Sequence, residues 1–126
     1  MSEIRLIDLN KDYDTICSWW AHYKYPILSK DELSTTGFII NDSYAVWVYF
    51  TNSKMCLIEN AIKNPSKELS DDMLSSIFQF LKTFCMNQGY NSIMSFSLNK
   101  HFIERLKSIG FKCSEKQVFV LTNEVR

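Results

Sequence analysis

SDDMLSSIFQFLKTFCMNQGY (residues 70–90), NSIMSFSLN (residues 91–99) and KHFIERLKSIGF (residues 100–111) carry the strongest structural signal in this chain. The first segment has hydrophobic residues at three- and four-residue intervals, which predicts an amphipathic helix that stops at Gly89. The second holds an apolar run of strand length, and the third returns to helical spacing until Gly110. Helix, strand and helix form half of a βαβ-type layered unit, so we expect a sheet with helices packed on it.

Upstream of these segments, the pattern predicts a strand, two helices and three further strands. The strand is expected around IRLIDL, the first helix at 10–23, and a short second helix after the capping box of Ser29 and Glu32. Three β-rich runs at 37–40, 44–51 and 55–62 are separated by short polar turns, which indicates an antiparallel meander. A last strand is expected at 117–121.

These elements together predict an α/β (α+β) fold. We expect a central mixed, mostly antiparallel sheet of about six strands, with about four helices on its two faces. A chain of 126 residues fits one domain, residues 1–126, and is long enough to bury a core. With 46% hydrophobic residues, intrinsic disorder is excluded.

Composition also excludes several classes of partner. Fourteen basic and fourteen acidic residues cancel, so there is no broad positive surface, and we expect neither nucleic acid nor a membrane as partner. The longest apolar run, at 44–50, is too short to span a bilayer, and no signal region is visible, which predicts a cytoplasmic protein. Four widely spaced cysteines form no C-x-x-C pair, so we expect reduced thiols and no metal site.

The order Gly89-Tyr90, strand, Asn99, helix, Gly110-Phe111 resembles the C-terminal half of the GNAT superfamily of acetyl-coenzyme A-dependent N-acetyltransferases. In that family a long helix closes on a glycine, and a strand, an asparagine and a helix ending in Gly-Phe follow. The order of elements is similar over essentially the whole chain. This resemblance implies a GNAT-like fold, acetyl-CoA as cofactor, and transfer of an acetyl group to a small amine or a protein lysine.

A second resemblance covers WWAHYKYPILSKDELSTTGFIINDSYAVWVYFTNSKMCLIENAIKNP (residues 19–65). This segment is similar to short GNAT-like proteins encoded by bacteriophages and prophages, in which Trp-Trp, a proline-containing loop, Thr-Gly-Phe, Thr-Asn-Ser and Asn-Pro recur. The similarity implies a small viral accessory protein that works in the host cytoplasm.

The chain departs from the family pattern at two functional positions. The family has an R-G-x-G-x-G segment at the entrance to the long helix, where backbone N–H groups bind the coenzyme's diphosphate. Here the segment is LSDDML (residues 69–74), without glycine or arginine. Asp71 and Asp72 complement the positive end of the helix, and each would repel a diphosphate by about 1 kcal/mol or more. At the position of the family's tyrosine acid stands Leu106.

The resemblance assigns candidate roles to five residues. Glu59, late in the fourth strand, is placed where several family members keep a general base; the alternative is a carboxylate facing solvent or paired with a lysine. The backbone of Ala61, Ile62 and Lys63 would bind the pantetheine arm. Asn99 matches an asparagine that touches pantetheine, although an ordinary helix N-cap explains it as well.

Aromatic residues of the first helix supply the candidate acceptor or partner contacts. Trp19, Trp20 and Tyr23 lie on the helix that forms one wall of the acceptor site in the family. Because Trp20 and Tyr23 fall on the apolar side of this helix, a core role is the alternative for both. Trp19 lies about 100° around the helix from Trp20, and is therefore the better candidate for a ligand or partner contact.

Two functions follow. The chain is either an N-acetyltransferase that uses acetyl-CoA, or a catalytically inactive GNAT-fold module that binds a host or viral protein. Glycines and a base at the entrance to the long helix favour the enzyme, whereas the paired aspartates found there favour the module. Both a monomer and a homodimer are compatible with the sequence.

Overall fold

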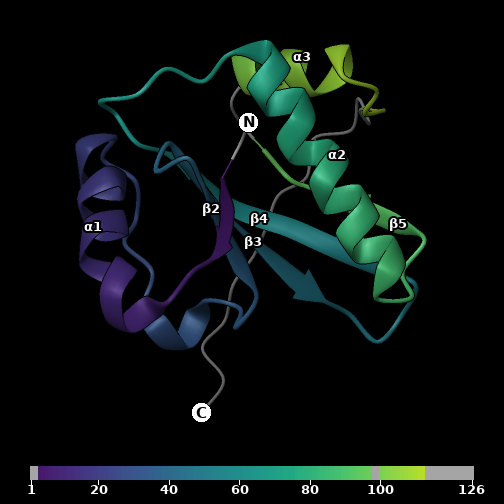
Figure 1. Cartoon of the computed structure of the whole chain (residues 1–126), viewed down its shortest axis with the longest axis horizontal. Coiled ribbons are helices and arrows are strands. Elements are labelled where there is room, and N and C mark those ends of the chain that lie inside the picture. The colour runs from purple at the N-terminus through teal and green to yellow at the C-terminus, as the bar shows by residue number, and fades with distance from the viewer. Residues whose placement is uncertain (1–2, 98–99, 113–126) are drawn as a thin grey trace. The chain divides into compact units, whose positions relative to one another are not determined.

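The structure is a computed structural model and describes residues 3–97 and 100–112 (Figure 1). Its elements are β1 (Ile4–Leu6), α1 (Leu9–His22), a 3-10 turn (Lys30–Glu32), β2 (Gly37–Ile40), β3 (Tyr44–Phe50), β4 (Met55–Lys63), α2 (Asp71–Asn87), β5 (Ser92–Met94) and α3 (Lys100–Ser108). The chain divides into two compact units after Phe96, and α3 belongs to the second.

The first unit is built on one five-stranded sheet with the order β1-β2-β3-β4-β5. Neighbouring strands are antiparallel except β4 and β5, which are parallel. The predicted mixed, mostly antiparallel sheet is therefore confirmed, with five strands described. The sixth strand, expected at 117–121, lies outside the described residues.

The helices differ from expectation at one place. The predicted second helix is a single 3-10 turn of three residues, because Leu33 adopts an extended conformation directly after it. The predicted capping contact is present: the carboxylate oxygen Oε1 of Glu32 accepts a hydrogen bond of 2.9 Å from the backbone N–H of Ser29. α2 ends where the sequence predicted, since Gly89 follows it with a φ of +94°.

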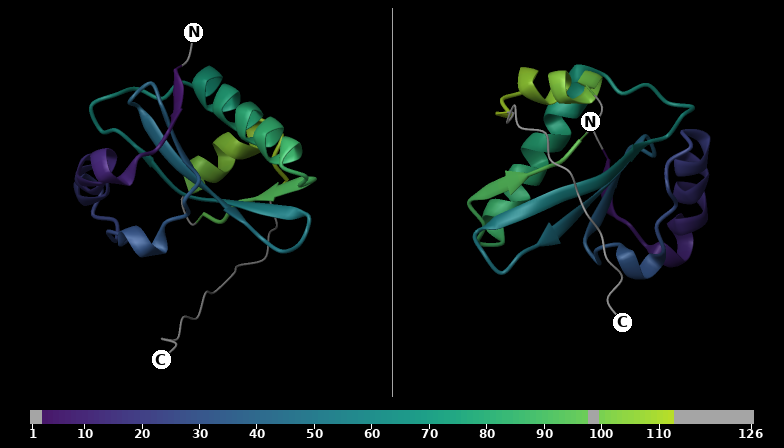
Figure 2. Two further views of the ribbon diagram at one scale, coloured as in Figure 1. Left: turned by 60° about the horizontal axis from the view of Figure 1, so that its bottom comes forward. Right: turned by 180° about the vertical axis from the view of Figure 1, so that it is seen from behind.

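The two long helices cover opposite faces of the sheet (Figures 1 and 2). On the α1 face, Trp20 stacks on Trp47 of β3 with 5.6 Å between ring centroids. On the α2 face, Phe38 of β2 meets Phe80 and Phe84 edge to face, at 5.1 and 5.0 Å. Both helices thus bury the apolar stripe that their sequence periodicity predicts.

The second unit contains α3, which ends in a left-handed glycine. Gly110 has a φ of +107°, and the backbone N–H of Phe111 donates to the carbonyl of Leu106 at 3.1 Å. This is the helix ending that the Gly-Phe pair predicted. None of the described helices is long and apolar enough to cross a membrane.

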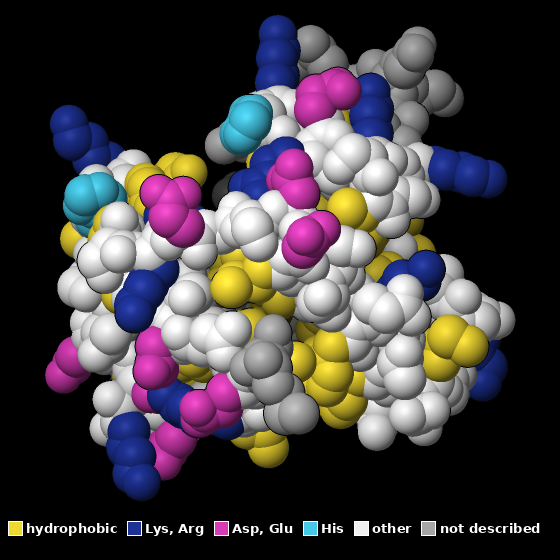
Figure 3. Space-filling model, turned by 45° about the horizontal axis from the view of Figure 1, so that its top comes forward, with side chains coloured by type: hydrophobic (Ala, Val, Ile, Leu, Met, Phe, Trp, Pro, Cys, Tyr) yellow, Lys and Arg dark blue, Asp and Glu magenta, His cyan; other side chains and the backbone are white. Residues whose placement is uncertain are grey.

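Charges are mixed on the surface. Figure 3 shows Lys, Arg, Asp and Glu side chains interspersed over one face, with hydrophobic side chains exposed between them. This distribution agrees with a formal net charge of zero. Among the described side chains drawn on this face, charges of one sign form no extended field that would attract a polyanion.

Gly37 is required by the close approach of Trp47. A Cβ atom built on Gly37 would lie 2.6 Å from Cδ1 of Trp47 and 2.9 Å from Cδ1 of Ile7. Since Trp47 is fully buried, its indole has little room to move away. The Trp20–Trp47 stack therefore depends on the missing side chain at position 37.

We expect Gly37→Ala to lower the free energy of unfolding by about 1–3 kcal/mol, because the added methyl group overpacks the core. Chemical denaturation followed by tryptophan fluorescence measures this loss. Thr15→Ala, at an exposed position of α1, is the control and changes stability by less than about 0.5 kcal/mol. Equal stability of Gly37→Ala and wild type would show that Trp47 is not held tightly.

A charged pair joins β1 to α1. The two guanidinium nitrogens of Arg5 donate to the two carboxylate oxygens of Asp12, both at 2.9 Å. Asp12 is buried, and its Oδ2 also accepts from the backbone N–H of Asp8 at 2.8 Å. The hydrogen bond from Arg5 is the main cause that lowers the pKa of Asp12 below its usual value.

We expect Asp12→Asn to destabilise the protein by about 1–2 kcal/mol at pH 7, since Arg5 loses a charged partner while remaining half-exposed to water. The lowered pKa sets the sign of the pH dependence: the stabilisation is complete above about pH 4 and is lost as pH falls through the folded-state pKa. Unfolding at several pH values measures both effects. Asp14→Asn is the exposed control; an identical loss with this variant would contradict the assignment.

Candidate functional site

The candidate site lies where β4 leaves β5. The two strands pair at Met55–Ser92, Cys56–Ile93 and Leu57–Met94. β5 ends at Met94, whereas β4 continues to Lys63, so the segment 58–63 of β4 extends past its described pairing with β5. Backbone groups on this side of β4 are therefore available to a ligand in the part of the chain that the structure describes.

A β-bulge changes the direction of β4 in this segment. Ala45 of β3 pairs with Ile62 and Trp47 pairs with Glu59, so that Asn60 and Ala61 together oppose one residue of β3. Asn60 has a φ of +61°, a left-handed conformation that asparagine tolerates better than most residues. The predicted strand is thus present but contains a β-bulge in its second half.

Side-chain hydrogen bonds hold this bulge. Nδ2 of Asn60 donates to the hydroxyl oxygen of Tyr49 at 2.6 Å, and the Tyr49 hydroxyl donates to the backbone carbonyl of Glu32 at 3.1 Å. Burial is the main cause that raises the pKa of Tyr49. From the sequence, no site role was predicted for Tyr49 or Asn60. The available signal was an asparagine inside a β-rich run, a residue that strands usually avoid.

Glu59 stands beside the bulge on the α1 face of the sheet, because its partner across β3 is Trp47, which stacks on Trp20. Its side chain is partly buried, and Oε1 accepts a hydrogen bond of 2.8 Å from the backbone N–H of Phe96. Burial raises the pKa of Glu59, and the N–H of Phe96 offsets part of that effect. A raised pKa brings a carboxylate closer to the range that suits a general base.

We expect Glu59→Gln to melt at a higher temperature than wild type at pH 7, because the amide oxygen still accepts from Phe96 and no charge is buried. The sign follows from the raised pKa: folding favours protonated Glu59, so wild type loses stability as pH rises through that pKa. The gap should therefore close at pH values below the carboxylate's titration. Calorimetric scans of both proteins across pH measure it; a gap independent of pH would contradict this account.

The N-terminus of α2 is capped by the side chain of Ser70. Oγ of Ser70 accepts from the backbone N–H of Met73 at 3.1 Å, and Asp71 and Asp72 are exposed in the first turn. The predicted serine cap is confirmed. Nζ of Lys63 donates to the carbonyls of Asn64 and Lys67 at 3.1 and 2.6 Å, so this side chain organises the loop before α2. The helix end is therefore a poor fit for a diphosphate.

The backbone contacts assigned to Ala61, Ile62 and Lys63 stay predictions. The structure places all three residues in the segment of β4 beyond its pairing with β5. The side chain of Ile62 is buried among the residues that pack on α1. Asn99 lies outside the described residues, and Leu106 is part of α3 in the second unit.

Trp19, predicted to be the better candidate for a ligand or partner contact, is buried. Trp19 is 6% exposed and belongs to the same core cluster as Trp20, because the buried face of α1 is wide enough to take both indoles. Tyr23 is partly buried and stacks on Tyr25 at 5.6 Å between centroids. Tyr25, just after α1, is 47% exposed and therefore presents an accessible aromatic ring.

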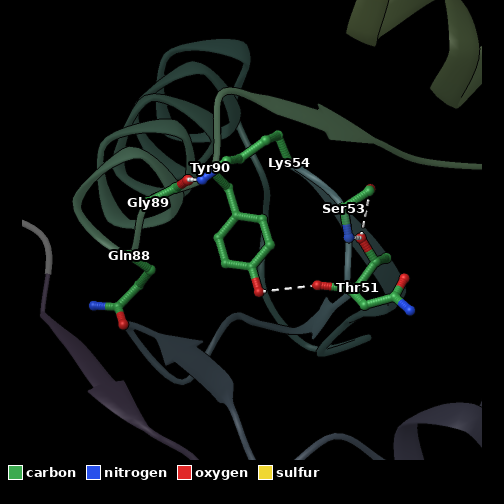
Figure 4. A pocket seen from close by; sticks show the side chains of 7 residues that line it. Thr51, Ser53, Lys54, Gln88, Gly89 and Tyr90 are labelled. Carbon is green, nitrogen blue, oxygen red and sulfur yellow. Dashed lines mark hydrogen bonds between the residues drawn. The ribbon is translucent and has the colours of Figure 1, made fainter.

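A surface pocket of about 400 Å³ lies at the other end of β4 (Figure 4). It is lined by Thr51, Asn52, Ser53, Lys54, Gln88, Gly89 and Tyr90. The Tyr90 ring points across it, and its hydroxyl donates to the carbonyl of Thr51 at 3.1 Å. Lys54 reaches the carbonyl of Gly89 at 3.5 Å. These contacts anchor the end of α2 to the β3–β4 turn, which explains the Thr-Asn-Ser segment structurally.

Two other kinds of site find no support in residues 3–97 and 100–112. No group of histidine, cysteine and acidic side chains there could hold a metal ion. Cys85 of α2 is buried beside Cys56 of β4, and burial raises the pKa of the Cys85 thiol to about 12. A thiol with such a pKa stays protonated at neutral pH and is a weak nucleophile.

No family model matches this sequence, and neither does any curated protein. Solved structures do match. Ribosomal-protein-alanine N-acetyltransferase from Brucella melitensis biovar Abortus 2308 superimposes with a TM-score of 0.72 at 11% identity, covering 98% of this chain and 100% of that one. The chain has the fold of the GNAT acetyltransferases.

Further structures with the GNAT fold support this assignment. An acetyltransferase from Trypanosoma brucei has a TM-score of 0.67 at 14% identity, covering 97% of this chain and 100% of that one. A predicted acetyltransferase from Clostridium acetobutylicum, solved with acetyl-CoA, has a TM-score of 0.64 at 14% identity and covers 96% of each chain. At these identities the likeness establishes the fold.

Proposed function

We propose that this chain transfers an acetyl group from a coenzyme A thioester to an amine, with Glu59 as general base. The observation that carries the proposal is a partly buried carboxylate with a raised pKa, located where β4 leaves β5. The GNAT fold and a neighbour solved with acetyl-CoA support it. Small amines and protein lysines are the acceptor classes that fit this chemistry.

The residues of this chain have distinct tasks in the reaction. The open edge of β4 at Ala61–Lys63 would hold the pantetheine arm through backbone hydrogen bonds, and the thioester would supply an electrophilic acetyl carbon. Glu59 takes a proton from the acceptor ammonium, and the free amine then attacks. A C–N bond forms and the C–S bond breaks. After the attack, the nitrogen releases its second proton to water. The departing thiolate takes a proton from water, because Leu106, at the position of the family's tyrosine acid, has no acidic proton.

The N-terminus of α2 disfavours the diphosphate of the coenzyme but does not affect the pantetheine contacts proposed on β4. Asp71 and Asp72 stand in the first turn, and Ser70 already occupies one of the free N–H groups. The diphosphate therefore adds no favourable contact there and meets two negative charges. The thioester would be held by its pantetheine end alone.

Titration calorimetry with acetyl-CoA and with S-acetylpantetheine tests this arrangement. We expect wild type to bind S-acetylpantetheine at least as tightly as acetyl-CoA, because the diphosphate contributes nothing favourable. Asp71→Asn/Asp72→Asn keeps the side-chain shapes and removes both charges, and should tighten acetyl-CoA about 5- to 30-fold, from about 1 kcal/mol per carboxylate. Its affinity for S-acetylpantetheine should not change.

Asp31→Asn/Asp42→Asn, two exposed carboxylates outside α2, is the matched control and should leave both affinities unchanged. Equal tightening of both ligands by the α2 variant would show that the aspartates do not face the diphosphate. Absence of binding by either ligand to any variant would overturn the transferase proposal.

A second function is favoured by a specific contact. The hydrogen bond from the N–H of Phe96 to Glu59 crosses the gap between β4 and the chain after β5, so a ligand entering there must displace it. Together with the aspartates of α2, this contact fits an inactive module that binds a host or viral protein in the host cytoplasm. The same titrations separate the two functions, since the module binds neither thioester.

A further inference from the structure

Apolar residues adjoin Glu59 where β4 leaves β5. Leu57 and Met94 are paired across β4 and β5, and side chains of paired residues point to the same face. Met94 is 38% exposed, and Phe96, whose backbone N–H donates to Glu59 at 2.8 Å, is 51% exposed. Leu57, Glu59, Met94 and Phe96 form what we call the Glu59 surface.

The charge of Glu59 has no cationic counterpart in the described part of the chain. No salt bridge reaches its carboxylate there, and no lysine or arginine contributes to its pKa, which burial raises. Within residues 3–97 and 100–112, its carboxylate accepts a hydrogen bond from the neutral N–H of Phe96. A partly buried carboxylate without a cation is costly, so the surface favours a ligand that brings a positive charge.

The polar groups closest in the chain to Glu59 are already bonded to one another. Asn60 donates to Tyr49, and Tyr49 donates to the carbonyl of Glu32. A ligand rich in hydroxyl groups would have to break these hydrogen bonds, and would also leave its own hydroxyls against Met94 and Phe96 without partners. The surface thus selects against polyhydroxylated amines.

We infer that the Glu59 surface binds a primary amine with an apolar body, the ammonium at the Glu59 carboxylate and the apolar part against Met94 and Phe96. This inference rests on the proposed function in taking that amine as the acceptor. Two interactions contribute to the binding free energy: burial of a phenyl-sized group and pairing of one charge. Each interaction alone gives weak binding. Recognition therefore requires both halves of the ligand.

Calorimetric titration without any coenzyme tests this inference with three matched probes. 2-Phenylethylamine carries both halves, 2-phenylethanol only the apolar body, and ethanolamine only the ammonium. We expect 2-phenylethylamine to bind at least tenfold more tightly than either of the others. Equal affinity of ethanolamine and 2-phenylethylamine would overturn the apolar half, and equal affinity of the alcohol would overturn the role of the charge.

Variants test which residue contacts the ammonium and which contacts the apolar body of the amine. Glu59→Gln should weaken 2-phenylethylamine at least tenfold and leave 2-phenylethanol unchanged, whereas Phe96→Ser should weaken both. Glu68→Gln, an exposed carboxylate in the loop before α2, is the matched control and changes neither. Met94→Ser provides a second apolar variant. An unchanged affinity in Glu59→Gln, with thermal unfolding showing a folded protein, would contradict the inference.

The outcome of this experiment can be distinguished from the outcome for the proposed function. Amine binding without acetyl transfer would leave the inference intact and remove the transferase. Acetyl transfer to ethanolamine, with no binding of 2-phenylethylamine, would support the transferase and overturn the inference about the apolar amine.

Discussion

The packing of Trp47 between Gly37 and Trp20 is the constraint on which the rest of the first unit depends. It fixes which face of β3 meets α1, and period-two alternation then fixes the faces of β2 and β4. Glu59, opposite Trp47, is thereby placed on the α1 side and not under α2. The register between β3 and β4 therefore places both the Trp47 core contact and the candidate catalytic carboxylate of Glu59.

The bulge in β4 shapes the candidate site. A regular strand would present one continuous edge, whereas the left-handed Asn60 bends β4 just where its pairing with β5 has ended. The strain of this conformation is offset by hydrogen bonds to Tyr49 and from Tyr49 to Glu32. Residues from β3, β4 and the 3-10 turn therefore cooperate in holding one backbone conformation.

Much of the fold could be predicted from the sequence because its signals are local. Apolar periodicity located α2 and α3, Gly89 and Gly110 located their ends, and short polar turns located the meander. The burial of Trp19 and the bulge at Asn60 could not be predicted in this way. Both depend on tertiary partners: the core residues that pack around Trp19, and a tyrosine eleven residues before Asn60 in the chain. Position 59 was identified by resemblance, whereas the absence of a nearby cation emerges only from the contacts of the described residues.

The parallel pairing of β4 with β5 has a consequence for how the molecule assembles. The antiparallel pairs of β2, β3 and β4 join neighbouring segments, whereas Met55 meets Ser92 only after the chain has passed through α2. Closing such a loop costs more chain entropy than closing a hairpin, and non-local pairing slows folding. We therefore expect the meander to form first and the gap beside Glu59 to be completed late, so that the hairpins serve as the template on which the site is assembled.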